Sequence, residues 1–228
     1  MMILFDLDDT LFDHKKAEVY AASCFLKHFS DVLHHDEAAF CALWRSVMEK
    51  HAERFFRGEI AFRAQRRERM REIFRDAHSN LSDEQADERF AVYLQHYECH
   101  WSLFEDVLPC MDSLKDVPLG IISNGNTEQQ NKKLRQMKIA ERFSTVVISE
   151  EVGVSKPSAE IFLEACRRAG VAPRECVYVG DSLEKDVLGS RAVGMRGIWL
   201  NRGGPPKKDP GVEVIFSLAD LKLQPNTH

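Results

Sequence analysis

The spacing of apolar positions divides the chain into two kinds of segment. Over much of its first half, apolar residues recur at helical spacing, as in Phe40, Trp44 and Val47, and no strand pattern appears. Asp36 and Ser82 are suitable N-caps for two of the helices that this spacing predicts. The predicted helices lie at residues 15–29, 36–56, 59–78 and 82–101.

The second half of the chain alternates between short apolar runs and helical segments. The predicted strands, including one near the N-terminus, lie at residues 3–5, 118–122, 145–148, 176–179, 197–200 and 213–216. The predicted helices between and after them lie at residues 110–116, 127–137, 159–169, 186–193 and 218–223. Strands separated by helical segments of about 10–15 residues are typical of βαβ units and a parallel sheet.

We therefore predict an α/β fold, with a Rossmann-like parallel sheet that carries helices on both faces. Residues 1–14 and 103–228 are expected to form this α/β core. Residues 15–102 are expected to form an all-helical domain inserted after the first strand.

The first strand ends in a cluster of acidic residues. Asp6, Asp8 and Asp9 fall within four positions, and like charges at this spacing repel one another and raise each other's pKa. A divalent cation would relieve the repulsion, and carboxylate oxygens suit Mg²⁺. Taken alone, the cluster fits an acidic turn equally well.

Polar residues also follow the ends of later strands. Ser123 comes after one apolar run, Asp181 comes after another, and Lys156 follows the strand at residues 145–148 by a short segment. Singly, these residues fit a helix cap, a turn residue and a surface lysine. In open α/β sheets, however, ligands bind outside the carboxyl ends of the strands. These three positions, together with Asp6, therefore indicate one shared site.

Four stretches carry a family resemblance. In chain order they are DLDDT at residues 6–10, LGIIS at 119–123, GVSKP at 153–157 and GDSLEKD at 180–186. They resemble the four motifs of the haloacid dehalogenase superfamily, a large group of mostly Mg²⁺-dependent phosphohydrolases, and they span nearly the whole chain. The resemblance implies that residues 15–102 correspond to the helical cap of that superfamily.

The resemblance also implies roles for individual residues. Asp6 would be the nucleophile that forms an aspartyl-phosphate, and Asp8 would act as general acid and then as general base. Lys156 would pair with the phosphate and with Asp6. Mg²⁺ would be held by the Asp6 carboxylate, the Asp8 carbonyl and Asp181, with Asp186 as a further ligand or as an acceptor for metal-bound water.

The remaining phosphoryl oxygens would be bound near the second motif. Ser123 and the backbone amides around Asn124 and Gly125 are expected to hold them, because glycine allows the backbone to approach a ligand closely. The implied partner is a small-molecule phosphomonoester.

The resemblance extends to particular branches of the superfamily. Residues 5–12 and 148–157 look most like the 5′-nucleotidase branch, which dephosphorylates nucleoside monophosphates. Enzymes similar to N-acylneuraminate-9-phosphatase have similar segments, so a sugar-phosphate phosphatase is an alternative. A phosphomutase is a further alternative. The founding 2-haloacid dehalogenases lack the second Asp, so Asp8 argues against that activity. A non-catalytic relative usually loses an acidic or lysine position, and none is missing.

Composition and charge limit the partners and the cellular compartment that we expect for this protein. The net charge of −5 argues against binding a nucleic-acid polymer. No apolar run approaches the roughly 18 residues of a membrane span, so no membrane partner is expected. A strand that begins beside Met2 leaves no room for a signal peptide, which predicts a cytoplasmic protein. The six cysteines lack C-x-x-C spacing and are expected to be reduced. A monomer and a homodimer both remain open.

Two features of the helical segment admit a functional and a structural interpretation. Its aromatic residues could stack a nucleobase, but we expect most of them to form the core of a helical domain. The arginine-rich run at residues 63–75 could attract an anion, but Glu68 and Glu72 interleave it at helical pairing distance. A solvated helix face is the expected outcome.

Overall fold

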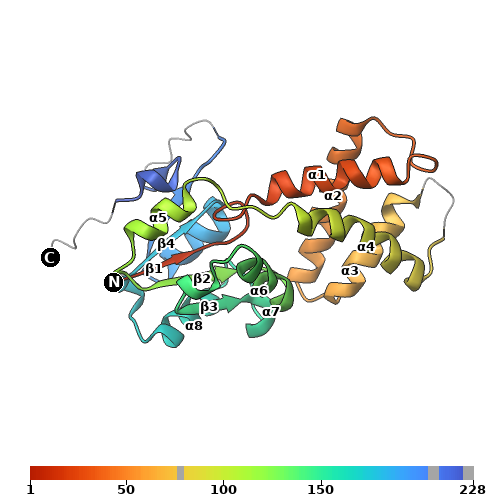
Figure 1. The fold of residues 1–228 in the computed structure, drawn as a ribbon. Coiled ribbons are helices and arrows are strands. Elements are labelled where there is room, and N and C mark those ends of the chain that lie inside the picture. The colour runs from red at the N-terminus through yellow and green to blue at the C-terminus, as the bar shows by residue number, and fades with distance from the viewer. Residues whose placement is uncertain (76–79, 205–210, 223–228) are drawn as a thin grey trace. The chain divides into compact units, whose positions relative to one another are not determined.

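The computed structural model describes residues 1–75, 80–204 and 211–222 (Figure 1). The chain divides into two compact units. One consists of Met1–Asp13 together with Leu103–His228, and the other of His14–Ser102. Among the described residues, no helix is both long enough and apolar enough to cross a membrane.

The first unit contains one six-stranded sheet in which all paired strands are parallel. Its strands are β1 (Met2–Phe5), β2 (Leu119–Ser123), β3 (Thr145–Ile148), β4 (Cys176–Gly180), β5 (Arg196–Leu200) and β6 (Glu213–Ile215). Their order is β3-β2-β1-β4-β5-β6, so the direction of winding reverses between β1 and β4. The predicted α/β fold is confirmed.

Helices connect these strands. They are α5 (Val107–Ser113), α6 (Thr127–Gln136), α7 (Ser149–Val152), α8 (Ala159–Ala169) and α9 (Gly189–Ala192), with single turns at Ala140–Arg142, Pro173–Glu175 and Leu218–Asp220. Two predictions were wrong in detail. The helix expected at residues 186–193 is a π-helix, Leu183–Leu188, followed by α9. The helix expected at residues 218–223 is one 3₁₀ turn within the described part of the chain.

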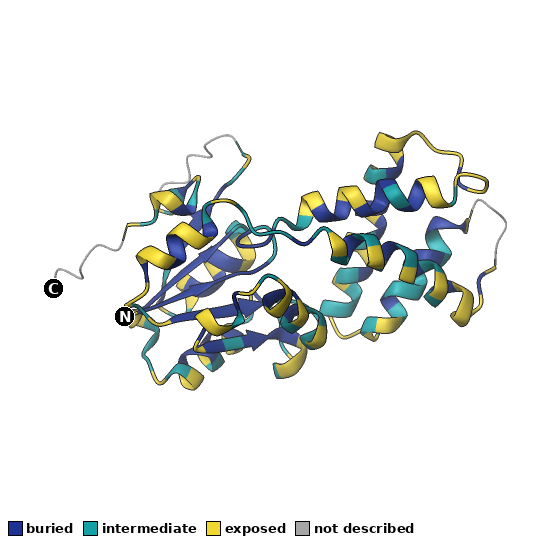
Figure 2. Cartoon of the chain, in the orientation of Figure 1, coloured by how far each residue is buried: buried dark blue, intermediate teal, exposed yellow. Residues whose placement is uncertain are grey.

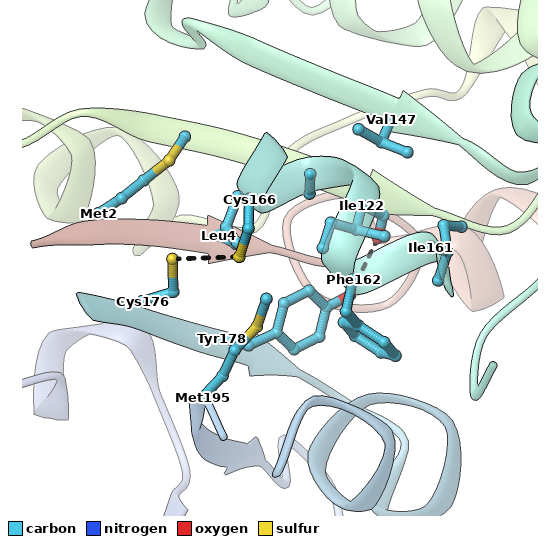
Figure 3. Packing of buried hydrophobic residues seen from close by; sticks show 11 residues of the cluster. Met2, Leu4, Ile122, Val147, Ile161, Phe162, Cys166, Cys176, Tyr178 and Met195 are labelled. Atoms are coloured by element: carbon cyan, nitrogen blue, oxygen red, sulfur yellow. Dashed lines mark hydrogen bonds between the residues drawn. The ribbon is translucent and has the colours of Figure 1, made fainter. Parts of the chain in front are cut away.

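The sheet buries both of its faces. Met2 and Leu4 of β1 pack with Tyr178 of β4 and with Ile161 and Phe162 of α8 in one hydrophobic cluster (Figure 3). Alternation along β1 directs its other residues to the opposite face, where they are also buried. Strands covered on both sides read as continuous apolar runs, which is why the sequence pattern located them well.

Two cysteines meet in this cluster. The Sγ atoms of Cys166 on α8 and Cys176 on β4 lie 3.7 Å apart, and both are buried (Figure 3). All six cysteines of the chain are free thiols.

The second unit is built from four α-helices among its described residues. They are α1 (His14–His28), α2 (Glu37–Phe56), α3 (Phe62–Ile73) and α4 (Asp83–Cys99). The Asp36 side chain accepts hydrogen bonds from two backbone amides at the start of α2, and Ser82 forms a capping box with Gln85 at the start of α4. Helix α3 is shorter than the predicted segment at residues 59–78, whose last residues lie outside the described ones.

Each of these helices buries one face (Figure 2), and on α1, α2 and α4 the buried residues are mainly apolar. Phe25, Phe40, Trp44 and Phe74 are almost completely buried, and the rings of Phe25 and Trp44 lie 5.1 Å apart between centroids. The interpretation of these aromatic residues as a helical core is confirmed.

The arginine-rich helix α3 is paired with acids, as expected, but mostly not with those on its own surface. Arg63 and Arg67 both donate to Asp87 of α4, and Arg67 and Arg71 also donate to Asp83. Within the arginine-rich run, Arg71 also pairs with Glu68, and Arg75 pairs with Glu72. The pairs with Asp83 and Asp87 join α3 to α4, whereas the expected solvated face would pair residues within α3 alone.

Candidate active site

Asp6 and Lys156 form the centre of the site. Asp6 follows β1 directly, and its backbone amide continues the sheet by donating to the carbonyl of Val179 at 2.9 Å. The Lys156 Nζ lies 2.5 Å from Asp6 Oδ1, and Thr10 Oγ1 donates to the other carboxylate oxygen at 3.2 Å. Asp6 and Lys156 are both buried, so solvent screens this ion pair weakly.

The Lys156 ammonium has two further partners. It lies 2.7 Å from Asp186 Oδ1 and 2.9 Å from the hydroxyl oxygen of Tyr178, which itself donates to the carbonyl of Ile122. Burial lowers the pKa of Lys156, but the carboxylates of Asp186 and Asp6 outweigh it and hold that pKa well above its ordinary value. Lys156 is therefore a permanent positive charge in the site.

Three carboxylates converge around this cation. Asp6, Asp181 and Asp186 each offer an oxygen, and these oxygens all lie within 4.8 Å of one another. Burial raises the pKa of the Asp6 carboxyl; Lys156 opposes the rise, and the charges of Asp186 and Asp181 add to it. The net pKa stays well above the ordinary value, so the cluster would gain from additional positive charge. Its oxygen donors fit a hard divalent cation.

A glycine makes room for this cluster. A Cβ atom placed on Gly180, the last residue of β4, would lie 2.4 Å from Asp186 Cγ. The Asp186 carboxylate also accepts a hydrogen bond from the Ser182 amide at 2.9 Å. The turn after β4 thus folds back onto its own strand, and this fold-back brings Asp186 beside Lys156.

The loop after β2 is tied to the segment that carries Lys156. The Asn124 side chain donates to the Lys156 carbonyl at 3.1 Å and accepts from the Lys156 amide at 2.8 Å. The Gly125 amide donates to Ser149 Oγ at 3.0 Å. Asn124 therefore serves to join two loops, and the Gly125 amide has a protein partner in this structure.

Ser123 and Asp8 are linked through one side chain of α6. Gln130 Nε2 lies 2.7 Å from Ser123 Oγ and 2.9 Å from Asp8 Oδ2. Lys133, one turn further along α6, lies 2.6 Å from Asp8 Oδ1. The Asp8 carboxylate thus points at α6 and receives a donor at each oxygen.

Sequence reasoning missed four residues of this arrangement: Thr10, Gln130, Lys133 and Tyr178. A signal existed for the two on α6, because they lie three residues apart on the face that also carries Leu134, which the helical period assigns to the core. Tyr178 was missed because it lies within an apolar run that predicts only a buried strand.

An arginine from outside the four motifs holds the loop that carries Asp8 and Thr10. Arg202, which follows β5, donates twice to the Thr10 carbonyl, at 2.8 and 3.2 Å. The same guanidinium binds both oxygens of Asp106, at 2.8 and 2.9 Å, and stacks over the Phe104 ring. Asp106 in turn accepts from the Ser217 hydroxyl and the Leu218 amide.

The chain is similar to known proteins. The model of the haloacid dehalogenase-like hydrolase family matches residues 1–194. The glyceraldehyde 3-phosphate phosphatase of Methanopyrus kandleri is 41% identical over 126 residues, which cover 54% of this chain and 51% of that protein. The chain therefore spans about half the length of that relative.

Two further proteins match over nearly the whole chain. The N-acylneuraminate-9-phosphatase of Homo sapiens is 28% identical over 220 residues, covering 94% of this chain and 89% of that protein. The crystal structure of a 2-haloacid dehalogenase from Pseudomonas syringae is 28% identical, with a TM-score of 0.69 and 96% of each chain covered.

Proposed function

Because the chain belongs to the haloacid dehalogenase-like hydrolase family, we propose that it hydrolyses a small phosphomonoester with Asp6 as the nucleophile. One observation carries the proposal. The Asp6 carboxylate lies at the end of a buried strand with Lys156 Nζ at 2.5 Å and with the carboxylates of Asp181 and Asp186 beside it. This edge of the sheet, where the winding reverses, is where open α/β folds bind ligands.

The reaction proceeds in two displacements. An Asp6 oxygen attacks phosphorus, the ester P–O bond breaks, and Asp8 gives a proton to the departing alkoxide. A water molecule then attacks the phosphorus of the aspartyl-phosphate, Asp8 takes a proton from that water, and the Asp6 carboxylate and inorganic phosphate are released. Two steps replace one difficult one, and Asp8 ends the cycle in the state in which it began.

Lys156 and Ser123 bind the substrate phosphate. The Lys156 ammonium neutralises charge on the phosphoryl oxygens while it keeps Asp6 in line for attack. Ser123 Oγ lies at the end of β2 and serves as a donor to a further oxygen. The Gly125 amide can join them once it exchanges its bond to Ser149 for one to phosphate, and Asn124 holds this loop against Lys156.

The carboxylates of Asp6, Asp181 and Asp186, with the Asp8 carbonyl, would hold Mg²⁺. When bound, Mg²⁺ offsets the negative charge gathered by the phosphate and the nucleophile. The raised pKa of the Asp6 carboxyl supports this assignment, because a nucleophile must be ionised and the buried cluster disfavours ionisation without further positive charge.

The substrate class is a phosphomonoester on a small organic molecule. A nucleoside 5′-monophosphate is supported by the phrases at residues 5–12 and 148–157. A sugar phosphate is supported by the human N-acylneuraminate-9-phosphatase, which matches 94% of this chain. Dehalogenation is the rival suggested by the Pseudomonas protein. Asp8 favours phosphate-ester hydrolysis, because a protonated carboxyl two residues from the nucleophile is needed only where an alkoxide leaves.

The test measures phosphate release from nucleoside monophosphates, sugar phosphates and p-nitrophenyl phosphate in Mg²⁺, and chloride release from 2-chloropropionate. We expect phosphate release by the wild type, none by Asp6→Asn, and full activity for Asp112→Asn, an exposed carboxylate paired with Arg142. Chloride release without phosphate release would overturn the proposal.

A further inference from the structure

We infer that Gln130 and Lys133 of α6 are positioning residues that hold the Asp8 carboxylate where it transfers protons. The inference rests on the phosphohydrolase reaction proposed above. It adds two residues outside the four motifs, on a helix for which the reaction had assigned no role.

The contacts account for both oxygens of Asp8. Lys133 Nζ donates to Oδ1 at 2.6 Å, and Gln130 Nε2 donates to Oδ2 at 2.9 Å. An aspartate side chain turns about two single bonds, and one hydrogen bond leaves at least one of these rotations open. Donors at both oxygens fix the plane of the carboxylate as well as its place.

The two donors are themselves held firmly. Lys133 is almost fully buried, and its ammonium lies 4.7 Å from the centre of the Phe12 ring, on the same loop as Asp8. Gln130 is equally buried, and a Cβ atom on Gly125 would come within 3.0 Å of its side chain. Both side chains are therefore enclosed by protein atoms and do not extend into solvent.

Gln130 also connects the proton-transfer residue to the phosphate-binding residue. Its Nε2 reaches Ser123 Oγ at 2.7 Å as well as Asp8. An amide nitrogen carries two hydrogens, so it can serve both acceptors at once. The distance between the bound phosphate and the acid that protonates its ester oxygen is therefore set in part by one buried side chain that contacts both residues.

A purely structural role explains these residue types poorly. Burying an ammonium group is costly unless it is paired, and an apolar residue such as the neighbouring Leu134 fills an inward helix position at no such cost. The ion pair with the Asp8 carboxylate compensates the charge of the buried Lys133 ammonium. The expected consequence of removing it is a misplaced Asp8, and small displacements of a reacting group lower rates strongly.

The first measurement compares Lys133→Met and Gln130→Met with matched controls on the same helix. Lys132→Met and Gln136→Met change exposed residues of the same types. With a sugar phosphate or nucleoside 5′-monophosphate that the wild type hydrolyses, and with saturating Mg²⁺, we expect kcat to fall by about 10- to 100-fold in the first pair. The KM of Lys133→Met should stay within about threefold of the wild-type value, because phosphate binding is kept and proton transfer is weakened. The control pair should match the wild type.

The second measurement asks whether the effect passes through Asp8. Single-turnover rates are compared with and without Lys133→Met in two backgrounds. The substitution should lower the rate when Asp8 is present, but should change it by less than about twofold in the Asp8→Asn background. Equal losses in both backgrounds, or wild-type kcat in both α6 variants, would overturn the inference. Thermal melting identifies folded variants, and Lys133→Gln, which keeps a donor, replaces Lys133→Met if that protein does not fold. An inactive wild type would instead overturn the proposed function itself.

Discussion

Lys156 Nζ lies 2.5 Å from Asp6 Oδ1, although the two residues are 150 positions apart in the chain. The same ammonium contacts Asp186, so the buried cation of Lys156, which lies between α7 and α8, joins the residue after β1 to the π-helix after β4. Removing one partner from a buried ion pair typically costs about 3–5 kcal/mol, because the other charge is left without compensation. Substitutions in this cluster must therefore be chosen so that stability and catalysis can be separated.

Asp6→Asn should separate the effect on catalysis from the effect on stability. Asparagine has the same shape and keeps an oxygen that can accept from Lys156, so we expect a folded protein. It cannot form the acyl-phosphate, and turnover should fall by about 1,000-fold or more. Phosphate release measures the loss, and thermal melting of the same sample checks the fold. Ordinary turnover by a cleanly folded variant would contradict the role of Asp6.

Mg²⁺ should stabilise the folded protein even when no substrate is present. A ligand that binds only the folded state at about 100 times its Kd adds about 2.7 kcal/mol, so Tm should rise on adding Mg²⁺ and fall back with EDTA. Asp181→Asn should weaken this response, while Asp112→Asn should keep it. Phosphate release should follow the same order. If adding Mg²⁺ leaves the Tm of the wild type unchanged, the carboxylate cluster is not a metal site.

Asp106 should make stability depend on pH. Burial raises the pKa of its carboxyl, but hydrogen bonds from Arg202, Ser217 and the Leu218 amide outweigh it and bring that pKa below its ordinary value. The folded state thus binds this proton less readily than the unfolded chain does. The stabilisation is present above the unfolded pKa of about 3.9 and is lost as the pH falls through the folded value.

Asp106→Asn provides the measurement. At pH 7 we expect it to lower the free energy of unfolding by about 1–3 kcal/mol, the usual effect of losing charged hydrogen bonds. In urea titrations near pH 3, the difference from the wild type should shrink. An equal difference at both pH values would show that the charge of Asp106 is not the cause.

Gly180→Ala should disturb the site through simple steric overlap. Its Cβ would come within 2.4 Å of Asp186, which must move away from Lys156 or push β4 out of place. Overpacking of this kind typically costs about 1–3 kcal/mol, and kcat should fall as well. Gly203→Ala is the matched control, because its added Cβ meets no described atom within 4 Å. Equal Tm and kcat values in the two variants would contradict the prediction.

The sequence alone determined which segments form the sheet and where its polar edge lies. Buried parallel strands are continuous apolar runs, and their carboxyl ends meet at one edge, so Asp6, Ser123 and Asp181 could be placed there from the pattern of residues. The caps at Asp36 and Ser82 were equally readable, because a cap is a contact between near neighbours in the chain.

Only the tertiary structure decided which polar side chains are buried and which residues they contact. Helical spacing places Gln130 and Lys133 on the face of α6 that carries Leu134, but only the structure shows that both contact Asp8 in the loop after β1. Arg67 reads as a partner of acids on its own helix, yet it binds Asp87 of α4. Local periodicity reports burial on average over a helix face. The identity of a buried polar group's partner depends on contacts between residues far apart in sequence, which periodicity does not encode.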